Sequence, residues 1–275
     1  MAEDEGPSSG WAPVERTAET DTWRARLIGD DHSIASMRRM WRHVPHGPRC
    51  KVCAAPFEGI GGVATRLFQH GRSTANPAMC GMCFRHLADH PGGAEIDVSI
   101  VFADIRGSTG IAETIGPGAF REALQAFYLL AAKAIEDNGG SVDKYLGDGV
   151  MALFIPVIAG ERHAERAVEA AVALVGAVER SSLPASGVRV GAGVHRGTAF
   201  VGVIGSGDRL DFSALGDPVN VAARLGALAG PGEVLASVDV WPSSVDERRR
   251  VEIAGRHDPL DVFVLRPARA GTTAS

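Results

Sequence analysis

Two short segments of the chain each place a carboxylate where a predicted strand meets a turn. Asp104 ends the apolar run 98–103, which is typical of a buried strand. Asp148 lies in a Gly-Asp-Gly sequence between two strand-like runs, a strong signal for a hairpin. Either aspartate alone would be an ordinary turn residue. Side by side on neighbouring strands, the two could hold a pair of divalent metal ions for phosphoryl transfer.

The turn after Asp104 is suited to binding an anion. Gly107, Ser108 and Thr109 are small residues that precede a predicted helix. Their backbone N–H groups would be free to face a phosphate at the helix N-terminus. A carboxylate pair beside such a turn indicates a substrate that carries both a metal ion and phosphate groups.

Three ordered segments, 102–109, 144–149 and 215–225, closely resemble the signature blocks of class III nucleotide cyclases. The similarity covers residues 94–267. The resemblance implies an α+β, ferredoxin-like catalytic domain that makes 3′,5′-cyclic AMP and pyrophosphate from ATP with two Mg²⁺ or Mn²⁺ ions.

By the same resemblance, individual residues acquire roles. The metal ligands would be the carboxylates of Asp104 and Asp148 and the carbonyl of Ile105. The β- and γ-phosphates would be held by Gly107, Ser108 and Thr109. Asn220 would orient the ribose, and Arg224, four residues later on the same helical face, would offset charge at the α-phosphate.

Base selection would rest on Lys144 and Ser213. Lys144 matches the adenine-selecting lysine of the family, and it can donate to N1 of adenine. Ser213 stands where many adenylate cyclases have Asp and one subgroup, class IIIb, has Thr. Because a serine hydroxyl both donates and accepts, guanine is not firmly excluded. Ala254 stands where many relatives have a phosphate-binding lysine, for which Arg256 is a possible substitute.

In this family, each active site forms between two catalytic domains. One protomer would provide Asp104 and Asp148, while the other would provide Lys144, Ser213, Asn220 and Arg224. Since this chain carries both sets in one domain, the resemblance implies a head-to-tail homodimer with two equivalent sites.

The four cysteines of the protein fall in two Cys-x-x-Cys pairs, Cys50 with Cys53 and Cys80 with Cys83. Four thiolates from two such pairs suit one structural Zn²⁺ ion, as in zinc ribbons. An iron–sulfur cluster and a dithiol redox switch are the alternatives. Five histidines nearby could replace one of these ligands, but we interpret them as surface residues: His43, His46, His70, His86 and His90.

Composition narrows the class of protein further. The chain has 275 residues, a net charge of −5 and 45% hydrophobic residues, which is typical of a globular protein and unlike a nucleic-acid-binding domain. We find no apolar run of ~18 residues and no signal-peptide pattern at the N-terminus. We therefore expect a cytoplasmic protein without membrane or nucleic-acid partners.

The expected organisation has five parts. Residues 1–20 form a disordered tail, 21–44 a helical segment that a break at 29–31 could split, 45–92 a zinc-ribbon-like module, 93–269 the cyclase domain and 270–275 a second tail. Within the domain, the pattern predicts helices over 118–137, 161–180 and 217–228. Two strands, 188–195 and 199–204, are expected on either side of Arg196-Gly197, with later strands near Val234 and Val262.

Several other functions fit the same residues. The domain could be a cyclase for GTP or a pyrimidine nucleotide, or a cyclase-like domain that binds a nucleotide or partner without turnover. It could also act as the sensor for a zinc module that binds DNA or protein, although the acidic composition disfavours DNA.

Overall fold

The computed structural model describes residues 17–30, 32–42, 44, 48–240, 247–256 and 258–268. The predicted tails over 1–16 and 270–275, together with His43 and His46, lie outside these residues. Residues 17–20 differ from the predicted tail, because Thr17 caps a helix that starts at Ala18. Its hydroxyl accepts a hydrogen bond from the backbone N–H of Thr20, which satisfies a free donor of the first turn.

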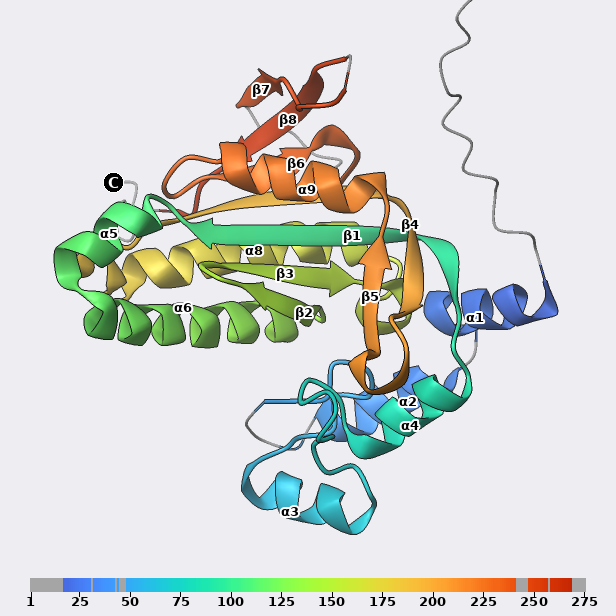
Figure 1. The fold of residues 1–275 in the computed structure, drawn as a ribbon. Helices are drawn as coiled ribbons and strands as arrows, with labels where there is room; N and C mark the ends of the chain where they lie inside the picture. The colour runs from blue at the N-terminus through green and yellow to red at the C-terminus, as the bar shows by residue number, and fades with distance from the viewer. Residues whose placement is uncertain are drawn as a thin grey trace, which may run out of the picture.

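An eight-stranded sheet is the centre of the structure (Figure 1). Its order is β2-β3-β1-β4-β6-β8-β7, and β5 pairs with β4 off this path. All pairings are antiparallel except that of β4 with β6. The strands are β1 (Gly93–Ile105), β2 (Ser141–Leu146), β3 (Gly149–Phe154), β4 (Val190–Ile204), β5 (Asp211–Leu215), β6 (Val234–Ser237), β7 (Arg248–Val251) and β8 (Leu260–Leu265).

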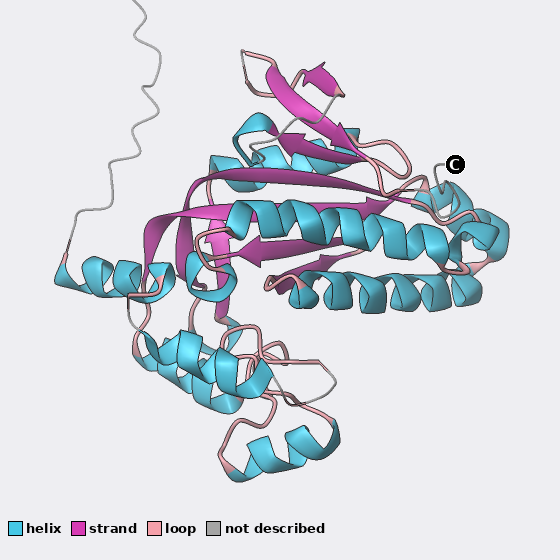
Figure 2. Ribbon diagram, turned by 180° about the vertical axis from the view of Figure 1, so that it is seen from behind, coloured by secondary structure: helices cyan, strands magenta, loops and turns pink. Residues whose placement is uncertain are grey.

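Helices cover both faces of this sheet. Two long helices, α6 (Pro117–Asp137) and α8 (His163–Arg180), lie along the face seen in Figure 2, and α9 (Asp217–Leu228) lies on the opposite face. The shorter helices of this region are α5 (Ser108–Ile115), α7 (Pro156–Ala159) and the 3₁₀ turns Leu183–Ser186, Gly207–Arg209 and Val238–Val240. No helix in the described ranges is both long and apolar enough to cross a bilayer.

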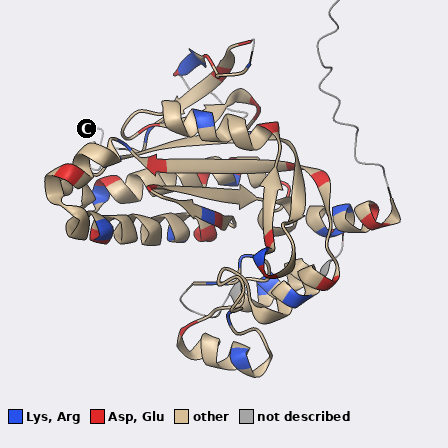
Figure 3. Ribbon diagram, viewed as in Figure 1, with Lys and Arg blue, Asp and Glu red and all other residues tan. Residues whose placement is uncertain are grey.

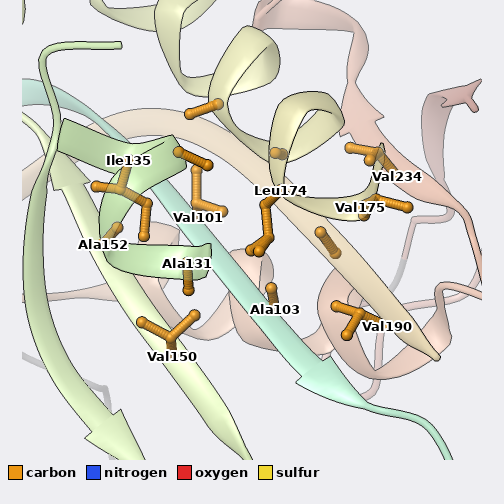
Figure 4. Packing of buried hydrophobic residues seen from close by; sticks show 14 of the residues in the cluster. Val101, Ala103, Ala131, Ile135, Val150, Ala152, Leu174, Val175, Val190 and Val234 are labelled. Carbon is orange, nitrogen blue, oxygen red and sulfur yellow. The ribbon is translucent and has the colours of Figure 1, made fainter. Parts of the chain in front are cut away.

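Strand β1 is apolar on both sides because both sides are covered. Val101, Ala103 and Ile105 pack with residues of α6 and α8, including Leu174 (Figure 4). The alternate residues Ile96, Val98 and Ile100 point into a second cluster on the other face. This two-sided burial explains the continuous apolar run that the sequence shows before Asp104.

The N-terminal segment packs against the same second cluster. It contains α1 (Ala18–Ile28), α2 (His32–Arg42), α3 (Gly59–Leu67) and α4 (Gly81–Asp89). The break between α1 and α2 falls at Gly29, which caps α1 in a left-handed conformation. Buried residues of this segment, among them Val52, Phe57 and Met79, share one hydrophobic cluster with Ile100 and Phe212 of the sheet.

The prediction of two strands around Arg196-Gly197 is wrong. Strand β4 runs unbroken through both residues, and Gly197 pairs with Val98 of β1. The Arg196 guanidinium donates to the Asp97 carboxylate of the neighbouring strand β1 at 2.8 Å, so this charged residue is paired between strands and does not interrupt β4. Strands β5 and β7 were not predicted from the sequence, and helix α8 starts two residues later than expected.

Gly193 of β4 allows α9 to lie at backbone contact with the sheet. A Cβ atom at this position would lie 2.6 Å from the Ala222 carbonyl oxygen and would also overlap the backbone nitrogen of Gly226. Helix α9 carries Asn220 and Arg224, so this close approach sets the height of both side chains above the sheet.

We expect Gly193→Ala to destabilise the fold by about 1–3 kcal/mol, because backbone atoms cannot yield to the added methyl group. The matched control is Gly118→Ala in the first turn of α6, where a Cβ meets nothing within 4 Å. Chemical denaturation of both variants checks the prediction. Equal stability of the two variants would show that α9 does not depend on this contact.

Candidate functional site

The two candidate metal carboxylates come from adjacent strands. Asp104 near the end of β1 is paired with Gly149, the first residue of β3, and Asp148 is the residue just before it. The Ile105 N–H donates to the Asp148 carbonyl oxygen at 3.1 Å. The predicted hairpin is present, and its tip is held against the end of β1.

A tyrosine that sequence reasoning missed holds this hairpin tip. The Tyr128 hydroxyl, from α6, donates to the Gly147 carbonyl oxygen. The centroid of the Tyr128 ring lies 4.2 Å from that of the Tyr145 ring. Burial, together with the nearby negative charge of Asp148, raises the pKa of Tyr128. The helix therefore fixes the loop that carries Asp148.

Arg106 lies against the carboxylate pair. It forms an ion pair with Asp104 and donates to the Ala227 carbonyl oxygen at 2.9 Å, beside the end of α9. Burial lowers the pKa of Arg106, and attraction to Asp148 opposes this shift. The Asp104 carboxylate is partly exposed, and Oδ1 is the atom that faces the Arg106 guanidinium. Carboxylate and carbonyl oxygens are the donors that Mg²⁺ prefers, so this end of the sheet fits a hard divalent cation.

The predicted phosphate turn follows directly. Gly107 has φ of +67°, a left-handed conformation that favours glycine, and it precedes the first residue of α5. Thr109 is exposed and Ser108 half-buried in the first turn of that helix. The free N–H groups of this turn therefore follow Asp104 directly in the chain, as the sequence predicts.

Lys144 and Ser213 converge from different strands. The Lys144 ammonium lies 3.2 Å from Asp143 and 3.3 Å from Asp211. The Ser213 hydroxyl donates to the same Asp143 carboxylate at 2.5 Å. Burial lowers the pKa of Lys144, but attraction to Asp143 and Asp211 outweighs this effect and raises it. Both aspartates were missed from the sequence, because their function depends on a strand, β5, that the pattern did not reveal.

The hydrogen bond of Ser213 decides which way its hydroxyl is directed. A carboxylate can only accept, so the serine proton points to Asp143. The oxygen of Ser213 then offers lone pairs, and not a proton, to a neighbouring group. Beside the Lys144 donor, Ser213 becomes an acceptor, the combination that matches the N1 and 6-amino group of adenine.

Asn220 and Arg224 lie on α9, with the spacing of four residues along one helix face that the sequence predicts. Asn220 is exposed, and a Cβ at Gly255 would lie 3.6 Å from both terminal nitrogens of Arg224. Arg256 pairs with Asp217 at 3.3 Å, at the start of the same helix. In the described part of the chain, no hydrogen bond or ion pair joins Asn220 or Arg224 to Asp104 or Asp148.

The four cysteines form one buried cluster. Their sulfur atoms all lie within 4.8 Å of one another. The backbone N–H of Cys80 donates to the sulfur of Cys50 at 3.3 Å, and that of Cys83 donates to the sulfur of Cys80 at 3.4 Å. Hydrogen bonds from Cys50 and Cys53 lower the pKa of Cys80, while hydrogen bonds within the same cluster raise the pKa of Cys53 and Cys83.

The interpretation of the nearby histidines as surface residues is wrong for one of them. His70 is buried, and its Nδ1 atom lies 3.3 Å from the sulfur of Cys80 and 3.7 Å from that of Cys53. It can donate to a thiolate or take the place of a ligand. His86 and His90 are exposed, as expected.

Residues 94–266 match the family model described as the adenylate and guanylate cyclase catalytic domain. Among curated proteins, an adenylate cyclase of Anabaena cylindrica is 34% identical over 142 residues, which is 48% of this chain and 27% of that protein. Adenylate cyclase 1 of Rhizobium meliloti is 36% identical over 134 residues, or 47% of this chain and 20% of the relative. The matches therefore span less than a third of the length of these relatives.

Solved structures show the same fold. The guanylyl cyclase Cya2 superposes with a TM-score of 0.60 at 25% identity, covering 67% of this chain and 98% of that structure. The adenylyl cyclase CyaB from P. aeruginosa gives a TM-score of 0.58 at 26% identity, with coverage of 65% and 97%. The predicted α+β cyclase fold is confirmed.

Proposed function

The chain belongs to the adenylate and guanylate cyclase catalytic domain family, and from this premise we propose that it converts ATP to 3′,5′-cyclic AMP and pyrophosphate. The observation that carries the choice of ATP is the convergence of Lys144 and Ser213 on Asp143. This arrangement offers a base one donor and one acceptor. Guanine presents the opposite pattern at the same two positions, so GTP is the second candidate and not the first.

Cyclases of this family use divalent metal ions. We propose Asp104, Asp148 and the Ile105 carbonyl as the ligands of two Mg²⁺ or Mn²⁺ ions. Bound there, the ions would acidify the ribose 3′-hydroxyl and neutralise charge on the leaving phosphates. The side chain of Arg106, now paired with Asp104, would have to swing away or turn toward the phosphates.

The remaining residues would bind and orient the nucleotide. Gly107, Ser108 and Thr109 would bind the β- and γ-phosphates through the N–H groups at the start of α5. Asn220 would hold the ribose, and Arg224 would stabilise the charge that develops on the α-phosphate. Close packing of α9 on Gly193 supports these last two roles, since it leaves the helix little freedom.

Catalytic domains of this family bind nucleotide and function as dimers. We propose a head-to-tail arrangement in which Asp104 and Asp148 of one protomer face Lys144, Ser213, Asn220 and Arg224 of the other. The lack of direct contact between Asp148 and Arg224 in the described chain supports this division. Each dimer would then contain two equivalent sites.

For residues 45–92 we propose a module that holds one structural Zn²⁺ ion through Cys50, Cys53, Cys80 and Cys83. Four buried sulfur atoms within 4.8 Å of one another suit tetrahedral coordination. An iron–sulfur cluster needs the same four thiolates and is the second candidate.

Purified protein should make cyclic AMP from ATP in preference to cyclic products of GTP, CTP or UTP, with Mg²⁺ or Mn²⁺. Lys144→Glu should lower kcat/KM for ATP about tenfold or more relative to GTP, because it replaces a charged donor by an acceptor. Initial rates with each nucleotide measure this. A uniform loss with all four nucleotides would show that Lys144 does not contact the base.

Metal analysis of the purified protein should find about one zinc ion per chain. Cys53→Ser should lower the bound zinc and the thermal stability, because a hydroxyl is a poor zinc ligand. Thr74→Ala, at an exposed position of the same segment, is the matched control. Bound iron and visible absorption bands in the place of zinc would contradict the assignment.

A further inference from the structure

One residue of the cysteine module (residues 45–92) contacts the cyclase-domain residues that surround the proposed base-selecting pair. Lys51 lies between Cys50 and Cys53, and its ammonium lies 2.6 Å from Asp211 and 3.1 Å from Asp143. These are the same two aspartates that hold Lys144. Figure 3 shows acidic and basic segments meeting where the lower end of β5 faces the N-terminal helices.

The cluster is balanced in charge, and two of its four side chains are shielded from water. It contains two lysines, Lys51 and Lys144, and two aspartates, Asp143 and Asp211. The Asp143 carboxylate is fully buried, and 5% of the Lys51 side chain is exposed. Burial of a carboxylate without a paired cation costs free energy. Lys51 therefore neutralises negative charge that Lys144 would otherwise have to neutralise alone.

The backbone of Lys51 is fixed from three directions. Its N–H donates to the Ala78 carbonyl oxygen at 3.0 Å, within the module. Its own carbonyl accepts from Arg38 of α2 at 3.1 Å and from the Ser141 hydroxyl of β2 at 3.0 Å. The ammonium position therefore depends on how the two cysteine pairs are held together.

A second contact from the module supports the same aspartate. The Asn76 side-chain amide donates to Asp211 at 3.0 Å and to the Leu210 carbonyl oxygen at 3.3 Å. Burial raises the pKa of Asp211, but attraction to Lys51 and the hydrogen bond from it outweigh burial and lower it. The start of β5, two residues before Ser213, is thus attached to the module.

We propose that Lys51 is a positioning residue for base selection, which couples the cysteine module to nucleotide binding. Lys51 and Lys144 both pair with Asp143 and Asp211. Because Lys51 neutralises part of their negative charge, the Lys144 ammonium is held less tightly and remains available to the adenine ring. Lys51 also keeps Asp143 in place to accept the Ser213 proton. This inference rests on the proposed function, because it assigns Lys51 to the base-reading pair of that same site.

Lys51→Met tests the proposal in the full-length protein, since it removes the charge and keeps most of the side-chain volume. With one cation left between two carboxylates, Lys144 is drawn toward them and away from the base. We expect KM for ATP to rise about tenfold and the preference for ATP over GTP to fall, with little change in kcat. Lys133→Met is the matched control, because Lys133 is 74% exposed on α6.

Asp211→Asn separates positioning from packing. In the Lys51→Met background it restores the balance of one lysine and one aspartate, so KM for ATP and base preference should return toward wild type. Alone, it frees Lys144 from one carboxylate and should lower KM for ATP. A purely structural role for Lys51 predicts the opposite, namely a double variant worse than either single one.

The outcomes distinguish this inference from the proposed function. If wild type makes cyclic AMP but Lys51→Met equals Lys133→Met in KM and base preference, the role of Lys51 is wrong and the function stands. If wild type turns over no nucleotide, the function is wrong, and the same variants are compared by ATP affinity in calorimetry. Unchanged affinity in Lys51→Met would then overturn the positioning role as well. Should Lys51→Met fail to fold, an unchanged or raised KM in Asp211→Asn alone would contradict the proposal.

Discussion

The burial of β1 on both faces is the constraint on which the rest of the structure depends. Val101, Ala103 and Ile105 pack under α6 and α8, and Ile96, Val98 and Ile100 belong to the cluster that the N-terminal segment completes. Its pairing with β3 sets Asp104 beside the tip that carries Asp148, and its pairing with β4 supports α9. Each group of candidate site residues is therefore positioned, directly or through one neighbour, by a single strand.

The cysteine module is better described as part of the same core than as a separate unit. Its sequence carries too few apolar residues to form a core of its own, so the proposed metal ion would supply part of the missing stability. The structure adds a second source, since Val52, Phe57 and Met79 are buried against the sheet. Contacts from Lys51 and Asn76 to Asp211 then extend the hydrophobic interface to the polar residues that we propose read the base.

Local signals in the sequence predicted much of this molecule. The hairpin at Asp148 and the helix at 217–228 follow from turn residues and helical periodicity, which are properties of neighbouring residues. Contacts between distant segments were not predictable in this way. Strand β5 is only five residues long, and Lys51 reads as an ordinary charged residue between cysteines until the fold brings it to Asp143. His70 was misread for the same reason.

We propose that each active site is shared between two protomers. Asp148→Ala and Arg224→Ala should each be nearly inactive, because every site in either homodimer lacks one component. When the two are mixed and exchange subunits, half the dimers are mixed, and one of the two sites in each is intact. About a quarter of wild-type cyclase activity should therefore return. A mixture that stays inactive, although subunit exchange is shown independently, would mean that Asp148 and Arg224 serve the same protomer's site.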